Sequence, residues 1–506
     1  MSGACRRTVW VLLIAAAAGG CASRESVYED IRRNRTASFE RWQAAHENRD
    51  EAETDEVLRG KLGIAESVQI ALGNNKQLRA ILEEKEKSTG RIVEAMSYAL
   101  PTVTVNGTYE KTDKVPTITF GPMQGAEGLP PLGRKDNWAY GVTFRQPVYT
   151  GGASTAAIRG AKIFQYLADE RIRTTAQNVI ASARRAYYDV LLQRVLQEVA
   201  ETSLKVSEEH VVEVKKRRRN GVASDFDVLR AEVEVSNFDA IAIEAKNRAH
   251  LAETSFFKVL GISQESHVEF VDALEFHPAD VKLVDVVEKA LAHRPDLYEA
   301  ELDVKLQRES IKVARSGWLP KVFLFADWES SKPSRVSMGN LGWDEEWSGG
   351  VRTEIPIFDG LKTLGRVIQE KATLRQKKTA LRDTEERALL EARQAYLTIR
   401  DSEEFVESQQ ASLDTATEAS RLAQVSYRNG VATQVEVLDA QEALTRARGN
   451  YYRAVHVHMV AKLELERATG ALAPKSADGL IEANKVRKAR EAGRPKPKKK
   501  DKQKSQ

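Results

Sequence analysis

The chain of 506 residues contains an internal duplication, which constrains its fold more than any other feature. Residues 220–223 (Asn-Gly-Val-Ala) return 209 positions later as residues 429–432. Residues 147–149 (Pro-Val-Tyr) correspond at the same offset to residues 356–358 (Pro-Ile-Phe), and nearer the N-terminus the offset becomes 219. Halves of this size are too long for solenoid repeats. The duplication therefore predicts one structural unit that is present twice.

Both halves show the same order of patterns, which predicts a mainly α fold with a small β part. Each half is expected to contain a helix, a β-hairpin, a very long helix and a returning helix. Proline follows the first helix of each half, where it favours termination. The expected ranges are a first repeat over 57–270 and a second over 271–472, first helices over 64–100 and 284–319, β-hairpins over 102–148 and 321–357, and long helices over 153–262 and 361–470.

The long helical stretches are rich in Ala, Leu, Glu, Lys, Arg and Gln, which are strong helix formers. Their first segments, residues 153–219 and 361–428, would each reach roughly 100 Å at 1.5 Å per residue. Beyond the N-terminus no run of 18 apolar residues occurs, so the sequence predicts no membrane-spanning helix. On composition alone, these stretches also fit a coiled-coil scaffold.

The hairpins carry alternating residues that fit strands with one apolar and one polar face. Val103, Val105 and Tyr109 share one face of the first strand. The second hairpin is less regular, because Phe323 and Phe325 fall on the face expected to be polar. Four strands cannot close a membrane barrel alone, so several chains would have to combine theirs. The alternative is a pair of hairpins packed on a soluble core.

The two ends of the chain have compositions of their own. Residues 1–20 resemble a bacterial lipoprotein signal peptide, after which Cys21 would be lipidated; the alternative is ordinary cleavage nearby. Residues 21–56 would form an N-terminal linker. The segment 473–506 is expected to be a disordered basic tail, since residues 485–506 hold eleven of the chain's basic residues and only two acidic ones. Basic charge confined to this tail argues against nucleic-acid binding.

The repeated turns have the local pattern of helix caps. Gly221 and Gly430 fit a left-handed residue that ends a long helix. Ser224 with Asp227, and Thr433 with Glu436, have the spacing of a capping box. Capping would account for both carboxylates, whereas Asp439, one turn further along, is not needed for it.

No constellation of catalytic, cofactor-binding or metal-binding residues is recognisable, so the sequence predicts neither an enzyme nor a metalloprotein. His456 and His458 are two residues apart, which places them on different helix faces, and packing is the expected role.

The lipoprotein-type signal, the two helix–hairpin–helix halves and the glycine turn before residues 435–441 (Val-Glu-Val-Leu-Asp-Ala-Gln) together resemble the TolC family of outer-membrane efflux proteins. The resemblance covers roughly residues 57–472. It implies a homotrimer with a 12-stranded β-barrel among the lipids of the outer membrane, continued by a trimeric α-barrel in the periplasm. It also implies a passive exit duct for tripartite efflux or type I secretion, working with a periplasmic adaptor and an inner-membrane transporter.

The resemblance places a periplasmic gate beside the glycine turns. The matching positions are Tyr427, Glu436 and Asp439, with Asp227 facing them from the first half. Ala432 stands where the family has an arginine, so a closing interaction of the family's usual type is not expected. The competing interpretation of the whole chain is a lipid-anchored periplasmic helical scaffold.

Overall fold

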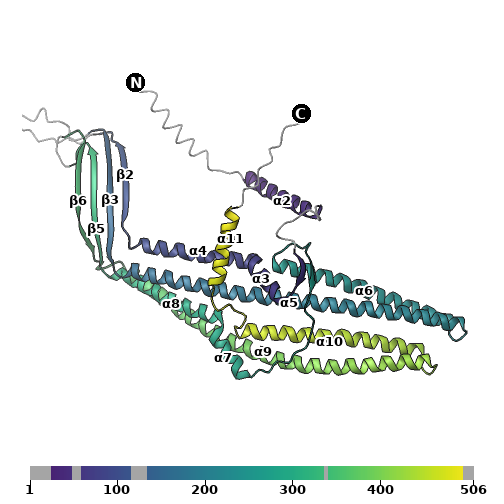
Figure 1. Ribbon diagram of the computed structural model, residues 1–506. Helices are drawn as coiled ribbons and strands as arrows, with labels where there is room; N and C mark the ends of the chain where they lie inside the picture. Colours follow the sequence, from purple (N-terminus) through teal and green to yellow (C-terminus); the bar gives the residue numbers. More distant parts are fainter. Residues whose placement is uncertain (1–23, 48–57, 115–133, 336–339, 494–506) are drawn as a thin grey trace, which may run out of the picture. The chain divides into compact units, whose positions relative to one another are not determined.

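The computed structural model in Figure 1 describes residues 24–47, 58–114, 134–335 and 340–493. The predicted signal peptide, Cys21 and the final 13 residues of the expected basic tail lie outside these ranges. The chain forms two compact units. The first comprises the residues up to Leu62 together with Ile262–Val271, and the second comprises the rest.

The first unit contains one helix and two short strands. Helix α2 (Arg24–Glu47) lies in the segment predicted to be a linker, and its many Arg, Glu and Ala residues favour a helix. Strand β1 (Arg59–Leu62) pairs in parallel with β4 (His267–Phe270). Both strands fall within the range expected for the first repeat, β1 at its beginning and β4 at its end, so the pairing joins the two ends of that repeat.

The second unit contains the remaining helices, whose order repeats once. They are α3 (Ile64–Asn74), α4 (Lys76–Ser97), α5 (Ala153–Arg219), α6 (Asp225–Leu260), α7 (Leu283–His293), α8 (Pro295–Arg315), the 3-10 helix η1 (Ser316–Trp318), α9 (Lys362–Arg428), α10 (Gln434–Ala468) and α11 (Asp478–Gly493). Helices α5 and α9 have 67 residues each, and they coincide with the predicted long segments. Among the described helices, none is both long enough and apolar enough to cross a membrane.

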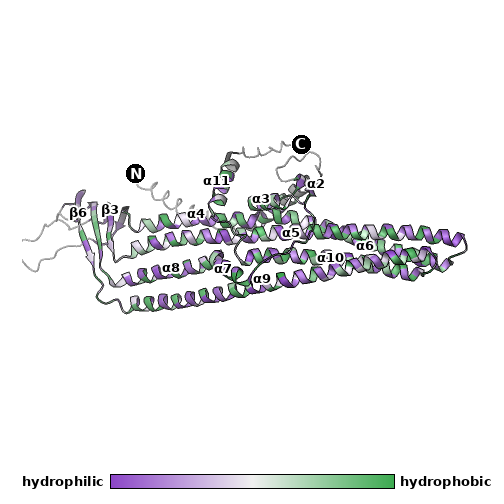
Figure 2. Ribbon diagram, turned by 60° about the horizontal axis from the view of Figure 1, so that its bottom comes forward, coloured by the Kyte–Doolittle hydropathy of each residue, from purple (hydrophilic) through white to green (hydrophobic). Residues whose placement is uncertain are grey.

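Each long helix packs against the helix that returns beside it, α5 with α6 and α9 with α10 (Figure 1). Polar and apolar residues alternate along these helices (Figure 2). Between α9 and α10, small residues such as Ala392, Ala395 and Ala461 form much of the core, together with Ile399 and Leu465. Small side chains let the backbones of these two helices approach closely.

The first helix of each half is broken, which corrects the prediction of one continuous helix over 64–100 and over 284–319. The breaks lie at Asn75 and Arg294, which are equivalent positions in the duplication. The Asn75 side chain accepts hydrogen bonds from the backbone N–H groups of Gln77 and Leu78 and so caps α4. Arg294 is extended because Pro295 follows it.

The strands form one antiparallel sheet at the end of the second unit that lies opposite the turns between the long helices (Figure 1). Its strands are β2 (Thr102–Lys111), β3 (Asp136–Thr150), β5 (Lys321–Lys332) and β6 (Asp344–Glu354), in the order β2-β3-β5-β6. The central pairing of β3 with β5 joins the two predicted hairpins. Strands β2 and β6 each have one edge without a partner strand in the described chain.

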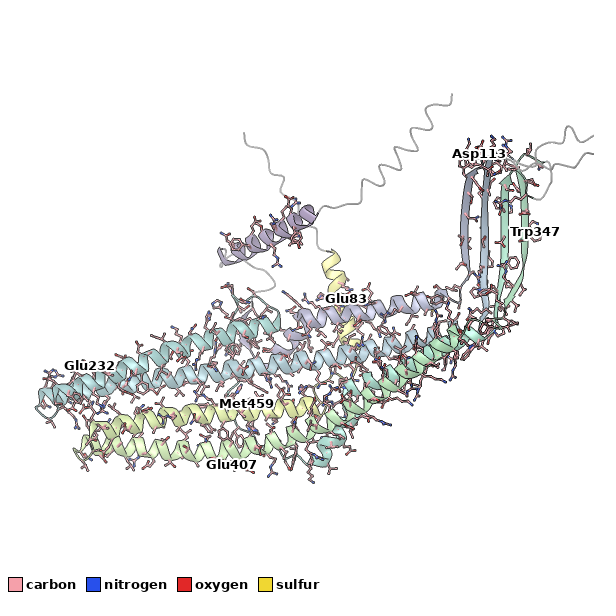
Figure 3. All side chains as sticks on the ribbon, turned by 180° about the vertical axis from the view of Figure 1, so that it is seen from behind. Glu83, Asp113, Glu232, Trp347, Glu407 and Met459 are labelled. Carbon is pink, nitrogen blue, oxygen red and sulfur yellow. The ribbon has the colours of Figure 1, made fainter. Side chains whose placement is uncertain are left out.

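Large apolar side chains are exposed along one face of this sheet. Trp347 on β6 is 81% exposed (Figure 3), and Tyr109 contacts Trp138 with ring centroids 4.4 Å apart. Cross-strand pairing places Tyr140 near Trp328, at 5.8 Å. The described chain alone therefore leaves a broad aromatic surface unburied.

Helix α11 corrects part of the prediction of a disordered tail over 473–506. The Ser476 hydroxyl accepts a hydrogen bond from the Asp478 N–H at the start of this helix. Near the C-terminal end of α11, Lys488 forms ion pairs with Glu83 and Glu86 of α4, at 2.6 Å each. Glu83 is labelled beside α11 in Figure 3. Basic charge predicted to be solvated is therefore partly neutralised on the helical body.

Arg294 generates a prediction about stability. Its side chain is only 8% exposed and forms ion pairs with Asp296 and Glu391, at 2.7 Å each. Burial opposes ionisation of Asp296, but the hydrogen bonds and charge of Arg294 outweigh it and hold the pKa of this carboxyl below its usual value. We expect Arg294→Ala to lower the free energy of unfolding by about 1–3 kcal/mol at pH 7, because it leaves two half-buried carboxylates without their partner.

The same ion pairs predict that the stability they contribute depends on pH. Thermal unfolding at several pH values measures this dependence. A depressed carboxyl pKa contributes stability that is present above the unfolded value of about 3.9 and is lost as the pH falls through the folded pKa. The difference between wild type and Arg294→Ala should therefore narrow below about pH 4. Arg248→Ala, which removes an exposed pair with Glu244, is the control and should change little. Equal effects of the two variants would contradict the assignment.

Candidate functional site at the helical tip

The two turns at the far end of the long helices have the same backbone conformation. Gly221 and Gly430 both have φ of 75°, in the left-handed region that glycine adopts without a steric cost. The N–H of Val222 donates to the Arg217 carbonyl, and the N–H of Val431 donates to the Ser426 carbonyl, at 2.9 Å each. This 6→1 bond closes each helix as a Schellman motif. The predicted helix endings are thus confirmed.

Both predicted capping boxes are present. The N–H of Ser224 donates to the Asp227 carboxylate at 2.9 Å, and the N–H of Thr433 donates to the Glu436 carboxylate at 2.7 Å. The backbone and side-chain hydrogen bonds from Ser224 lower the pKa of Asp227. Local capping therefore accounts for the positions of Asp227 and Glu436. Their role as gate residues stays a prediction.

Tyr427 is held by Arg217, one of a run of basic residues that no local sequence pattern distinguishes. The guanidinium of Arg217 lies 4.1 Å from the centroid of the Tyr427 ring. Its Nη2 also donates to the carbonyl oxygens of Tyr427 and Arg428, at 2.9 and 3.1 Å. Arg217 on α5 thus caps the C-terminal end of α9, where a cation is favourable. We call Arg217, Tyr427 and Arg428 the arginine clasp.

The surroundings of the clasp are partly buried. Tyr427 is 8% exposed, and this burial raises the pKa of its hydroxyl. The ring of His210 lies 5.6 Å from that of Tyr427, and burial, followed by the charge of Arg217, lowers the pKa of His210. A small cavity here is lined by His210, Glu213, Phe238 and Gln441 among others. Tyr427 therefore contributes to contacts between the two helix pairs within one chain.

A second contact joins the two turns. The Nε2 of Gln434 donates to the Asp227 carbonyl at 3.0 Å, and Gln434 is buried. The first residue of α10 is thereby fixed to the first turn of α6. Asp227 and Tyr427, from different halves, are thus brought to the same end of the second unit.

Asp439 differs from the other predicted gate residues. It lies on α10, is exposed, and has no hydrogen bond or ion pair with another residue in the described ranges. No contact within the described ranges fixes the position of this carboxylate. Among the four predicted gate residues, it is the one without such a contact in the described ranges.

The two histidines have structural partners. His458 is 1% exposed, with Nδ1 at 3.1 Å from the Ser402 hydroxyl and Nε2 at 3.0 Å from the His277 carbonyl. His456 lies 2.8 Å from Asp189. The described residues contain no group of three potential ligands that could hold a metal ion.

The comparisons with known proteins agree with this architecture. The family model of outer membrane efflux proteins matches residues 67–262 and 286–471, one stretch for each repeat. The chain belongs to this family. It is consequently an outer-membrane protein, and its relatives are channel proteins rather than enzymes.

Individual relatives are distant but are matched over most of their length. The chain is 22% identical to the alkaline protease secretion protein AprF of Pseudomonas aeruginosa, over 84% of this chain and 88% of the relative. It is 21% identical to the outer membrane protein TolC of Vibrio cholerae, over 84% and 94%. The crystal structure of the Campylobacter jejuni CmeC outer membrane channel superposes with a TM-score of 0.69 at 15% identity, covering 83% of this chain and 89% of that chain.

The arginine clasp predicts how the tip responds to mutation. We expect Arg217→Ala to speed amide hydrogen exchange of Gly430 and Val431 by about ten-fold, because it removes a charged donor from the last carbonyls of α9. Arg218→Ala is the matched control, since Arg218 pairs with Asp225 in its own turn and does not reach α9. Exchange that is equally fast in both variants would show that the clasp does not hold the tip.

Proposed function

We propose that this chain is one of three identical subunits of an outer-membrane exit duct. The observation that carries the proposal is a four-stranded sheet with two open edges and an exposed aromatic face, in a chain of the outer membrane efflux protein family. Unpaired backbone groups are costly in hydrocarbon. If β6 of each of three chains paired with β2 of the next, every strand edge would have a partner and the strands would form a 12-stranded barrel.

The aromatic face then contacts lipid, and the opposite face lines the water-filled interior. Trp and Tyr at strand margins suit the membrane interface, where an amphipathic ring is stable. Lipidation of Cys21 would add an anchor to the same membrane. The barrel transports passively, because the family consists of channels.

The long helices continue the duct into the periplasm as a trimeric α-barrel. A helix of 67 residues spans about 100 Å, enough to carry the tip far from the outer membrane. There the turns at Gly221 and Gly430 would meet a periplasmic adaptor, which links them to an inner-membrane transporter. Some relatives bear the names of protease secretion proteins and others of efflux proteins, and both uses need such a duct.

Asp439 is the proposed gate residue. Threefold symmetry would place three Asp439 carboxylates around one axis at the tip, and like charges in a narrow lumen attract cations. The capped residues Asp227 and Glu436 would support the shape of the tip, while Tyr427 would hold its helix pairs together through the arginine clasp.

Planar-bilayer recording of the purified, detergent-extracted protein tests this function. We expect discrete, mildly cation-selective conductance steps from a three-chain particle. Asp439→Ala should raise the conductance or reduce the cation selectivity by roughly two-fold, because it removes the carboxylate ring. Asp239→Ala, an exposed carboxylate on α6, is the control.

An unchanged record for Asp439→Ala would overturn the gate assignment alone. A particle of one chain without conductance would overturn the duct and favour the lipid-anchored helical scaffold.

A further inference from the structure

The polar face of the sheet has an unexpected layer near the helices. Phe323 and Phe325 of β5 lie on this face, where the pattern of a water-filled interior calls for polar residues. Arg145 of β3 pairs with Phe325 in the strand register, and Arg352 of β6 pairs with Phe323. Directly paired residues of neighbouring strands share a face. The two arginines and two phenylalanines therefore form one layer across three strands.

Each arginine covers the ring that is diagonal to it. The Arg145 guanidinium carbon lies 3.9 Å from the centroid of the Phe323 ring, and that of Arg352 lies 4.9 Å from the centroid of Phe325. Phe323 is only 8% exposed. Cation–π contacts of this kind fix a guanidinium in place while one of its faces stays open. The rings therefore act as supports for the two cations.

The arginines of this layer are not neutralised. Both are exposed, and neither forms an ion pair with another residue in the described ranges. At the helix end of the same face, Glu354 is the carboxylate, and Lys321 pairs with it in the strand register. The other carboxylates of this face on β5 and β6, Asp327, Glu329 and Glu346, lie further from the helices. Positive charge is thus concentrated at the base of the sheet, and negative charge nearer its other end.

We propose that Arg145 and Arg352 form an anion-binding ring at the base of the barrel, which attracts small organic anions during export. This inference rests on the proposed three-chain duct, in which the layer occurs three times around the lumen. Charges of one sign around a narrow aqueous passage focus the potential and raise the local concentration of counter-ions. A guanidinium binds a carboxylate through two parallel hydrogen bonds, and the Phe325 ring, which is only partly buried, favours an aromatic or apolar body beside it. The preferred ligand is therefore an aromatic carboxylate.

Reversal potentials in a KCl gradient test the charge of this ring. The double variant R145Q/R352Q should lower the chloride-to-potassium permeability ratio about two-fold or more relative to wild type. The matched control is R134Q/K135Q, which removes two exposed positive charges directly before β3, at its end away from the helices, and should change the ratio less. Equal ratios in wild type and R145Q/R352Q would overturn the proposal.

Block by benzoate tests the chemistry of the ligand. Wild type should be blocked by benzoate more strongly than by neutral benzamide, and R145Q/R352Q should lose this preference. The variant R145K/R352K keeps the charge but loses the planar guanidinium, so it should keep the anion preference and bind benzoate several-fold more weakly. Block that is equally strong in wild type and R145Q/R352Q would contradict binding at this layer.

A thiol assay makes the test independent of conductance, which a closed tip would abolish. Thr104 lies on the same face, one layer away from Arg145, since Thr104 pairs with Thr143. The measured quantity is the rate of labelling by an anionic methanethiosulfonate reagent divided by the rate for a cationic one. This ratio should be higher in T104C than in T104C/R145Q/R352Q. Mass spectrometry identifies the labelled peptide.

Unchanged relative rates in a three-chain particle would overturn the ring and leave the duct intact. A one-chain particle would instead overturn the proposed function on which the ring depends.

Discussion

Strands β2 and β6 each have an unpaired edge, and the arrangement of the whole protein in a membrane depends on how these edges are paired. A sheet with one aromatic face is stable in a membrane only if its backbone N–H and C=O groups are all paired. The described strands satisfy this at β2–β3, β3–β5 and β5–β6 but at neither edge. Closure by further copies of the chain meets the condition without any new element. The same copies would place the long helices around a common axis.

The duplication supplies two similar helix pairs, but the contacts that hold them together are not duplicated. Both halves end their long helix in the same Schellman motif and begin the next helix with the same capping box. Arg217, however, corresponds to Ser426 in the second half. The guanidinium of the arginine clasp therefore has no equivalent there. Likewise, Arg145 and Arg352 come from different halves and lie at non-equivalent positions. The arginine clasp and the proposed anion-binding ring therefore both lie at places where the repeats differ.

Local chemistry explains which features the sequence could predict. The caps at Gly221, Gly430, Asp227 and Glu436 depend on residues within one or two turns, and their spacing is legible in the chain. The breaks at Asn75 and Arg294 were missed because apolar periodicity continues across them. Pro295 was the available signal for the second break, since proline at the first helical position favours a helix start there.

A single sequence does not show which residues of distant segments contact one another. Arg217 stands in a run of five basic residues, and nothing local distinguishes the member that reaches α9. Phe323 and Phe325 were visible as exceptions to the strand pattern, but their partners Arg145 and Arg352 depend on the register of three strands. The basic residues around helix α11 favoured the prediction of a disordered tail. The ion pairs of Lys488 with Glu83 and Glu86 join residues that are far apart in the sequence, so no local pattern indicates them.

The number of chains in the membrane-extracted particle tests the central claim most directly. Native mass spectrometry should be combined with disulfide cross-linking of cysteines placed in turn along β2 and β6, neither of which contains a native cysteine. The account predicts a three-chain particle in which β2 of one chain cross-links to β6 of the next. A one-chain particle, or a trimer in which no β2–β6 pair forms, would contradict it.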